Sequence, residues 1–102
     1  MNKRQLGNTN INLTAIGFGG APLGNLFENL DERNCYDILE KTYNEGINIY
    51  DTSPLYGYGL SEHRLGNFLK TVDEESYFLS TKVGRYLTPA KKDNIDRGRF
   101  AG

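Results

Sequence analysis

The chain has few of the residues that disulfide bonds and metal sites require. Its 102 residues include one cysteine, one histidine and no tryptophan. The single cysteine, Cys35, excludes an intramolecular disulfide and suits a reducing compartment, so we expect a cytoplasmic protein. One cysteine and one histidine are too few for the usual ligand set of a structural zinc site, and we expect no metal site.

An excess of charge of one sign is also absent. Twelve Lys and Arg residues oppose thirteen Asp and Glu residues, for a net charge of −1. Nucleic acids and anionic membranes attract basic proteins, so neither is an expected partner. No apolar run approaches the roughly 20 residues that a membrane-spanning helix needs. The length suggests one domain at most, and the 37% hydrophobic content is ordinary for a globular protein.

The first part of the chain predicts a β-hairpin over residues 4–14. Two short strand-like segments, 4–6 and 11–14, flank the turn sequence Gly7-Asn8-Thr9-Asn10. A short apolar strand over 15–19 follows, and Pro22 and Gly24 then indicate a loop over 20–29.

Two later segments have the periodicity of amphipathic helices. Asp31 is the predicted N-cap of the first, Gly46 ends it, and its inner face is predicted to be Cys35, Ile38, Leu39, Thr42 and Tyr43. Ser61 is the predicted N-cap of the second, whose predicted inner face is Leu65, Phe68, Leu69 and Val72.

Strand-like segments over 47–50 and 77–83 follow the two helices. The order is therefore hairpin, strand, helix, strand, helix, strand. This alternation predicts an α/β fold with a parallel sheet and right-handed crossovers.

Three polar side chains mark the points where two of these strands give way to loops. Asp51 closes the segment 46–53, and Lys82 lies at the end of the segment 77–83. Tyr56 lies between them, in the turn-rich loop 54–62. The carboxyl ends of neighbouring parallel strands meet at one rim, so the three are expected to converge. A cation beside a phenol lowers the pKa of the phenol, which makes Tyr56 a candidate proton donor to a carbonyl.

Other chemically capable residues have plainer interpretations. Gly17-Phe18-Gly19-Gly20 resembles the start of a dinucleotide fingerprint, but Pro22 replaces its last glycine and no helix pattern follows directly. A tight bend between strand and loop explains these glycines. His63 is expected to be a surface or packing residue and Cys35 a core residue, whereas Tyr58 either lines a pocket or only packs.

The ordered motifs around the three rim residues resemble those of the aldo-keto reductases. The signature-like segment is Gly46-x-x-x-Tyr50-Asp51-Thr52-Ser53-x-x-Tyr56-Gly57-x-Gly59-x-Ser61-Glu62-x-x-Leu65-Gly66. Leu79-Ser80-Thr81-Lys82-Val83-Gly84 resembles the third strand of that family, and the resemblance extends over residues 4–86. The residues Asp51-Thr52-Ser53-Pro54 and Gly84-Arg85-Tyr86 are most similar to the L-galactose, L-fucose and D-threo-aldose 1-dehydrogenase branch.

The resemblance implies the N-terminal portion of a (β/α)₈ barrel that binds NAD or NADP and acts on an aldose or another carbonyl or alcohol. It implies catalytic roles for Asp51, Tyr56 and Lys82, and places Gly20, Ala21 and Asp51 near the nicotinamide. Tyr56 would be the general acid and base, with Lys82 lowering its pKa and Asp51 holding Lys82. The fourth catalytic residue of the family, a histidine after the next strand, has no counterpart in this sequence, and His63 does not match it.

A barrel of this kind needs about 250 residues, so we expect residues 1–102 to form a partial domain. It would comprise the hairpin 4–14, β/α units over 15–83 and a polar loop over 84–102. We expect such an interrupted chain to be inactive alone. Two alternatives are a non-catalytic binding or regulatory subunit on the same scaffold, and a small α/β domain in which the three residues are a structural polar cluster.

Overall fold

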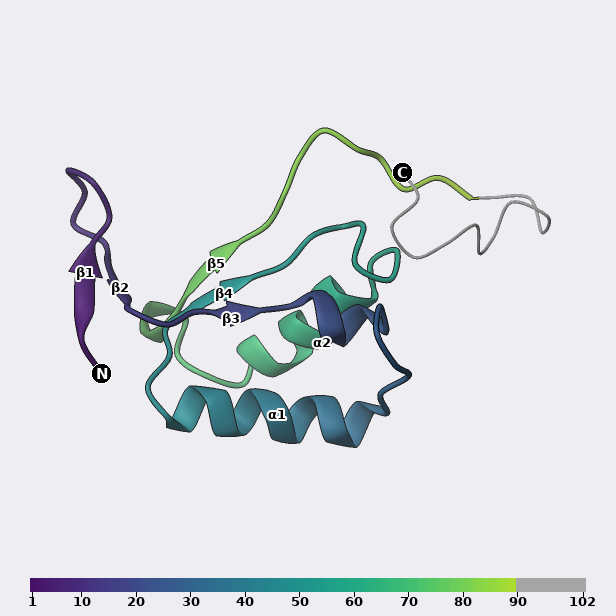
Figure 1. Cartoon of the computed structure of the whole chain (residues 1–102), viewed down its shortest axis with the longest axis horizontal. Helices are drawn as coiled ribbons and strands as arrows, with labels where there is room; N and C mark the ends of the chain where they lie inside the picture. The colour runs from purple at the N-terminus through teal and green to yellow at the C-terminus, as the bar shows by residue number, and fades with distance from the viewer. Residues whose placement is uncertain (90–102) are drawn as a thin grey trace.

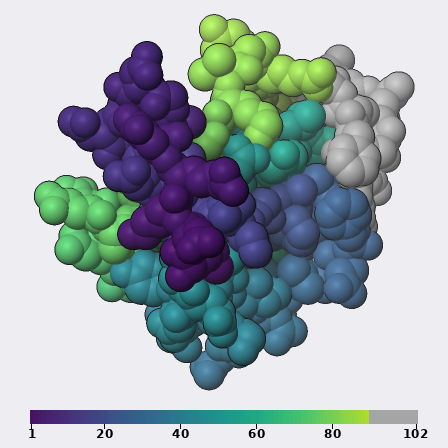
Figure 2. Space-filling view, turned by 60° about the vertical axis from the view of Figure 1, so that its left-hand side comes forward, coloured from purple at the N-terminus to yellow at the C-terminus, as the bar shows by residue number. Residues whose placement is uncertain are grey.

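The computed structural model describes residues 1–89 and contains a separate N-terminal hairpin beside an α/β unit (Figure 1). In the hairpin, β1 (Lys3–Gln5) pairs antiparallel with β2 (Asn12–Thr14), which confirms the predicted hairpin. The turn begins with Gly7 at a φ of +54°, a left-handed conformation that glycine adopts without steric cost. Figure 2 shows the hairpin as a distinct ridge on the forward face of the molecule.

One buried amide connects the hairpin to the rest of the fold. The Asn48 side chain accepts a hydrogen bond from the Thr14 backbone N–H at 2.8 Å and donates one to the Asn12 carbonyl at 3.0 Å. The Thr14 hydroxyl in turn accepts from the Asn48 backbone N–H at 3.2 Å. Asn48 is 8% exposed, and these bonds satisfy its buried polar groups while fixing the end of the hairpin.

The described sheet has the strand order β3-β4-β5, with both pairs parallel. Its strands are β3 (Phe18–Gly19), β4 (Ile49–Asp51) and β5 (Phe78–Ser80). The predicted parallel sheet is confirmed, but the strands are shorter than expected. The last ladder bond runs from the Thr52 N–H to the Ser80 carbonyl, so the chain beyond Ser80 has left the sheet before Lys82.

The first helix, α1 (Glu32–Asn44), begins as predicted. Asp31 caps it, with its carboxylate accepting from the Asn34 N–H at 2.7 Å. The helix ends immediately before Glu45 and Gly46, and Gly46 has the left-handed φ of +93° that favours glycine at this position.

The second helix, α2 (Leu60–Leu69), begins earlier than predicted. Its N-cap residue is Gly59, at a φ of +97°, so the prediction of Ser61 as the N-cap is wrong. The left-handed turn at Gly59 starts the helix before Ser61 and points the Ser61 hydroxyl at the sheet. There the hydroxyl donates to the Gly20 carbonyl at 2.7 Å and lies 2.7 Å from the Thr52 hydroxyl.

Two short 3-10 helices complete the described elements. The predicted loop over 20–29 contains η1 (Ala21–Gly24), which has Pro22 in its first turn, and η2 (Glu74–Ser76) precedes β5. The predicted polar loop over 84–102 can be followed only to residue 89, and residues 81–89 contain no helix or strand. The remainder of that loop lies outside the described residues.

Both α-helices lie on one side of the sheet and form the core with it (Figure 1). The buried hydrophobic cluster comprises Leu23, Cys35, Leu39, Tyr50, Leu65, Phe68 and Leu69. The predicted inner face of α1 is wrong at Ile38, which is 41% exposed. Successive residues are about 100° apart around a helix, so Ile38 lies at the edge of the stripe centred on Cys35 and Leu39. Val72, predicted on the inner face of α2, is half-buried beyond its end.

No helix within residues 1–89 is both long and apolar enough to cross a membrane.

Candidate active site

The candidate site lies where β4 and β5 end. Asp51 is the last residue of β4, in register with Gly19 of β3 and Ser80 of β5. Lys82 follows two residues after β5, and Tyr56 lies in the loop that joins β4 to α2. The parallel pairing therefore places the ends of both strands at one rim, as the sequence predicts.

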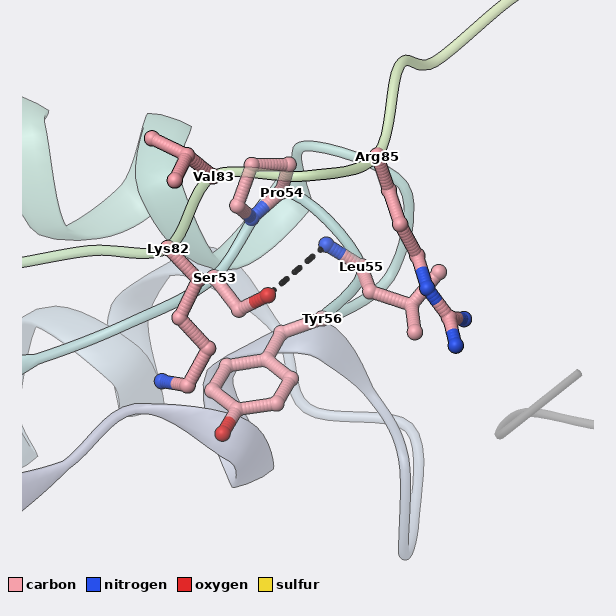
Figure 3. A pocket seen from close by; sticks show the side chains of 7 residues that line it. All are labelled: Ser53, Pro54, Leu55, Tyr56, Lys82, Val83 and Arg85. Carbon is pink, nitrogen blue, oxygen red and sulfur yellow. Dashed lines mark hydrogen bonds between the residues drawn. The ribbon is translucent and has the colours of Figure 1, made fainter. Parts of the chain in front are cut away.

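The three polar side chains meet at this rim. The Lys82 ammonium donates to the Asp51 carboxylate at 3.0 Å and to the Thr52 carbonyl at 3.0 Å. The same nitrogen lies 5.1 Å from the centre of the Tyr56 ring. In Figure 3 the Lys82 and Tyr56 side chains run side by side and present their polar ends in the same direction. The predicted convergence of Asp51, Tyr56 and Lys82 is thus present in the structure.

The contacts of Lys82 favour its charged form. The hydrogen bond that Lys82 donates to Asp51 raises the pKa of Lys82 above its ordinary value, and the Tyr56 hydroxyl adds to this in the same direction. The side chains of Lys82 and Asp51 are 47% and 43% exposed. A cation therefore stays beside the phenol in a place that a small molecule in solution can reach.

The loop that carries Tyr56 is a tight, hydrogen-bonded turn. The Tyr56 N–H donates to the Ser53 carbonyl at 3.1 Å, and the Tyr56 carbonyl accepts from the Ser61 N–H at 3.1 Å. Gly57, at a φ of +71°, packs directly on η1: a Cβ atom built on it would lie 2.4 Å from the Gly24 carbonyl oxygen. Two glycines far apart in sequence thus allow a backbone contact that larger residues would prevent.

Of the predicted nicotinamide-facing residues, Gly20 and Ala21 lie at the start of η1 and Asp51 at the end of β4. The Gly20 N–H donates to the Asp51 carbonyl at 2.7 Å, and a Cβ atom on Gly20 would lie 2.7 Å from that oxygen. At Gly19 the space where a Cβ atom would project is open to 4 Å, and Ala21 is half-buried. The uncovered backbone of Gly19 beside the half-exposed Asp51 carboxylate leaves room for a flat ring, whereas Gly20 itself is buried.

A hollow of about 250 Å³ adjoins the rim (Figure 3). Its lining comprises Ser53, Pro54, Leu55, Tyr56, Lys82, Val83 and Arg85. Tyr58 lines a second hollow beside it and is 53% exposed, which settles its two predicted alternatives in favour of pocket lining. His63 is exposed and Cys35 is buried, as predicted. Within residues 1–89 no group of three His, Cys, Asp or Glu side chains could hold a metal ion.

Two residues near the site have contacts that the sequence interpretation did not predict. Ser61 links α2 to Gly20, and Arg64, for which the sequence analysis makes no prediction, is 7% exposed and donates hydrogen bonds to four acceptors. The only local signal for Arg64 is a charged residue beside Leu65 on the buried stripe of the helix. Spacing within a helix identifies such a residue but not its partners.

The sequence pattern of the Aldo/keto reductase family matches residues 15–99. The chain belongs to this family. Its three parallel strands and two helices are a partial N-terminal part of the aldo-keto reductase barrel, and the described sheet is not closed.

The similar proteins include dehydrogenases with different named substrates. The chain is 47% identical over 77 residues to D-threo-aldose 1-dehydrogenase from Pseudomonas sp, a match that covers 76% of this chain and 23% of that protein. It is 43% identical over 86 residues to pyridoxal 4-dehydrogenase from Microbacterium luteolum, with 84% of this chain and 25% of that protein covered. The chain thus spans about a quarter of these aldo-keto reductase relatives.

A solved aldo-keto reductase has the same fold over nearly the whole chain. The holo form of AKR11C1 from Bacillus halodurans superposes with a TM-score of 0.77 and 35% sequence identity. The match covers 90% of this chain and 29% of that one. The predicted family and fold class are therefore confirmed.

Proposed function

We propose that this chain is the N-terminal part of an NAD- or NADP-dependent oxidoreductase that moves hydride between a nicotinamide and a small carbonyl or alcohol. Membership of the aldo-keto reductase family supports the reaction class. An aldose is the first candidate substrate because one of the similar proteins is named for that activity. Pyridoxal, in the name of another, is the competing candidate.

The observation that carries the proposal is the Lys82 ammonium, placed between the Asp51 carboxylate at 3.0 Å and the Tyr56 ring at 5.1 Å. The cation favours the phenolate over the phenol, which eases loss of the Tyr56 proton. Tyr56 donates that proton to the carbonyl oxygen during reduction and takes one from the hydroxyl during oxidation. Asp51 holds Lys82 in place and keeps it charged.

The nicotinamide cofactor, when bound, supplies or accepts the hydride. Gly20, Ala21 and Asp51 would lie near its ring: the open backbone at Gly19 is in register with Asp51 and supports this, although Gly20 itself is buried. Substrate would enter through the hollow beside Tyr56. A cytoplasmic location is part of the proposal, supported by a single cysteine that is buried and unpaired.

Replacement of Tyr56 by phenylalanine in the complete enzyme tests this assignment. Tyr56→Phe keeps the ring but removes the proton donor, so turnover should fall by about 10²- to 10⁴-fold while nicotinamide binding persists. Turnover is measured from NADH or NADPH absorbance, and binding from fluorescence. Tyr36→Phe is the matched control, since Tyr36 lies on α1 and lines neither hollow, so the same change should leave turnover unaltered.

Two results would contradict the proposal. Full turnover by Tyr56→Phe would show that Tyr56 is not the proton donor and acceptor. A wild-type protein that binds nicotinamide but reduces no aldose, pyridoxal or simple aldehyde would favour the alternative, a non-catalytic subunit on this scaffold.

A further inference from the structure

Arg64 connects segments that are distant in sequence. From α2, its guanidinium reaches the carbonyls of Leu23 at 2.9 Å and Leu30 at 2.8 Å. It also donates to the Asn25 side-chain oxygen at 2.9 Å and pairs with Glu32 at 2.7 Å. The Arg64 side chain is only 6% exposed, so these contacts form inside the fold.

The ion pair is one of four contacts, and the other three acceptors are uncharged. The Glu32 side chain is 66% exposed, and a pair with one partner in water contributes little to stability. The three uncharged acceptors instead use the planar fork of donors that arginine has and lysine lacks. The arrangement therefore serves to hold the backbone of residues 23–30 in one shape.

Residues 23–30 contact the loop that carries Tyr56 through the backbone of Gly24. A Cβ atom on Gly24 would lie 2.4 Å from the Tyr56 carbonyl carbon and 2.8 Å from the Gly57 nitrogen. Gly24 is buried and is adjacent to Leu23, whose carbonyl Arg64 holds. A shift of this segment would consequently move the backbone of Tyr56, whereas Lys82 is held separately by Asp51 and the Thr52 carbonyl.

We propose that Arg64 is a positioning residue for Tyr56, acting through Gly24. Its guanidinium holds residues 23–30 in place, and Gly24 in turn holds the Tyr56 backbone so that the phenol stays beside Lys82. This inference deepens the proposed function and rests on it for the kinetic test. The mechanical link between Arg64 and the loop can be tested without any activity.

The experiment compares Arg64→Met with wild type in the complete enzyme. A small displacement of a reacting group by a distant mutation can cost up to about 10²-fold, so kcat per folded site should fall about 10- to 100-fold with a smaller change in KM. Folded sites are counted by nicotinamide titration, so a merely structural role would lower their number and leave kcat per site unchanged. Hydrogen exchange measured by mass spectrometry should be faster in both 21–30 and 54–59.

Two further variants complete the design. Arg33→Met is the matched control: Arg33 is 85% exposed and pairs only along the helix with Asp37, so neither kcat nor exchange in the two segments should change. Arg64→Lys keeps the buried charge but not the fork, and should fall between wild type and Arg64→Met. If Arg64→Met does not fold, Arg64→Lys carries both measurements.

The possible outcomes distinguish a positioning role of Arg64 from a purely structural one. A lower kcat together with faster exchange in 54–59 supports the inference. Unchanged exchange in 54–59, or an unchanged kcat per site, overturns it even if 21–30 loosens. Failure of the proposed function would show instead as full turnover by Tyr56→Phe, and the exchange data would still decide whether Arg64 holds the loop.

Discussion

The helix-covered core and the rim of the described sheet have opposite characters. The side covered by α1 and α2 is closed: Tyr50, Leu65 and Phe68 are at most 2% exposed. The rim and the β5 edge are open: the Asp51 and Lys82 side chains are roughly half exposed, and Leu79 of β5 is 54% exposed. The closed side contributes stability, and the open rim carries the groups able to do chemistry.

Two tyrosines from adjoining segments make the same contrast. Tyr50 is fully buried in β4, donates to the Ile47 carbonyl at 2.9 Å, and burial raises its pKa to about 12. Tyr56, one loop later, lies at the open rim beside a cation. Of the two phenols, only the second is placed to exchange a proton with a substrate.

The largest expected effect concerns the open side of the 102-residue chain studied alone. Strands of an unclosed parallel sheet leave an unpaired edge and an uncovered apolar face, both of which favour association. We expect this chain to be unstable or self-associating and to have no dehydrogenase activity with an aldose plus NAD or NADP. Sedimentation and an NADH-absorbance assay measure the two properties.

Leu79→Ser tests whether the exposed apolar surface at the β5 edge causes the association. It places a hydroxyl on exposed sheet surface and should lower the associated fraction. A stable, active monomer of the unmodified chain would show that the open side needs no cover.

The next effect concerns the closed side. Phe68 is 2% exposed and packs edge-on against Tyr36 and Tyr43, with ring centres 5.4 and 5.9 Å away. Phe68→Ala in the complete enzyme should lower the free energy of unfolding by about 3–5 kcal/mol, because it removes a buried ring and leaves a cavity. Denaturant unfolding measures the change. His63→Ala, on the exposed side of the same helix, should stay within about 0.5 kcal/mol of wild type.

The smallest effect concerns the rim. Asp51 is the main cause of the raised pKa of Lys82, so Asp51→Asn should lower that pKa toward its ordinary value of 10.5. Because folding raises this pKa, the pair stabilises the fold fully below the ordinary value, and the contribution disappears as pH rises through the raised value. Titration of the Lys82 side chain by NMR would detect the change, and an identical titration curve in Asp51→Asn would exclude the pairing.

Local pattern was enough to predict much of the fold and the centre of the site. The hairpin, the Asp31 cap, the end of α1 at Gly46 and the alternation of strands and helices all depend on neighbouring residues, and the structure confirms them. The convergence of Asp51, Tyr56 and Lys82 was also predictable, since parallel strands bring their carboxyl ends to one edge.

Spacing was insufficient wherever the partner of a residue lies on another element. Ser61 looked like a helix cap, but the left-handed turn at Gly59 begins the helix earlier and turns the hydroxyl toward Gly20. Ile38 matched the apolar stripe, yet its edge position left it outside the contact between α1 and the rest of the core.

The sequence by itself determined the alternating strands and helices and the strand-end positions of the polar groups, because periodicity, caps and turns are encoded within a few residues. Only the tertiary structure decided that Arg64 would hold residues 23–30 and that Gly24 would touch the Tyr56 backbone. These contacts join residues more than thirty positions apart, and their distances depend on how helices pack on the sheet rather than on any local pattern.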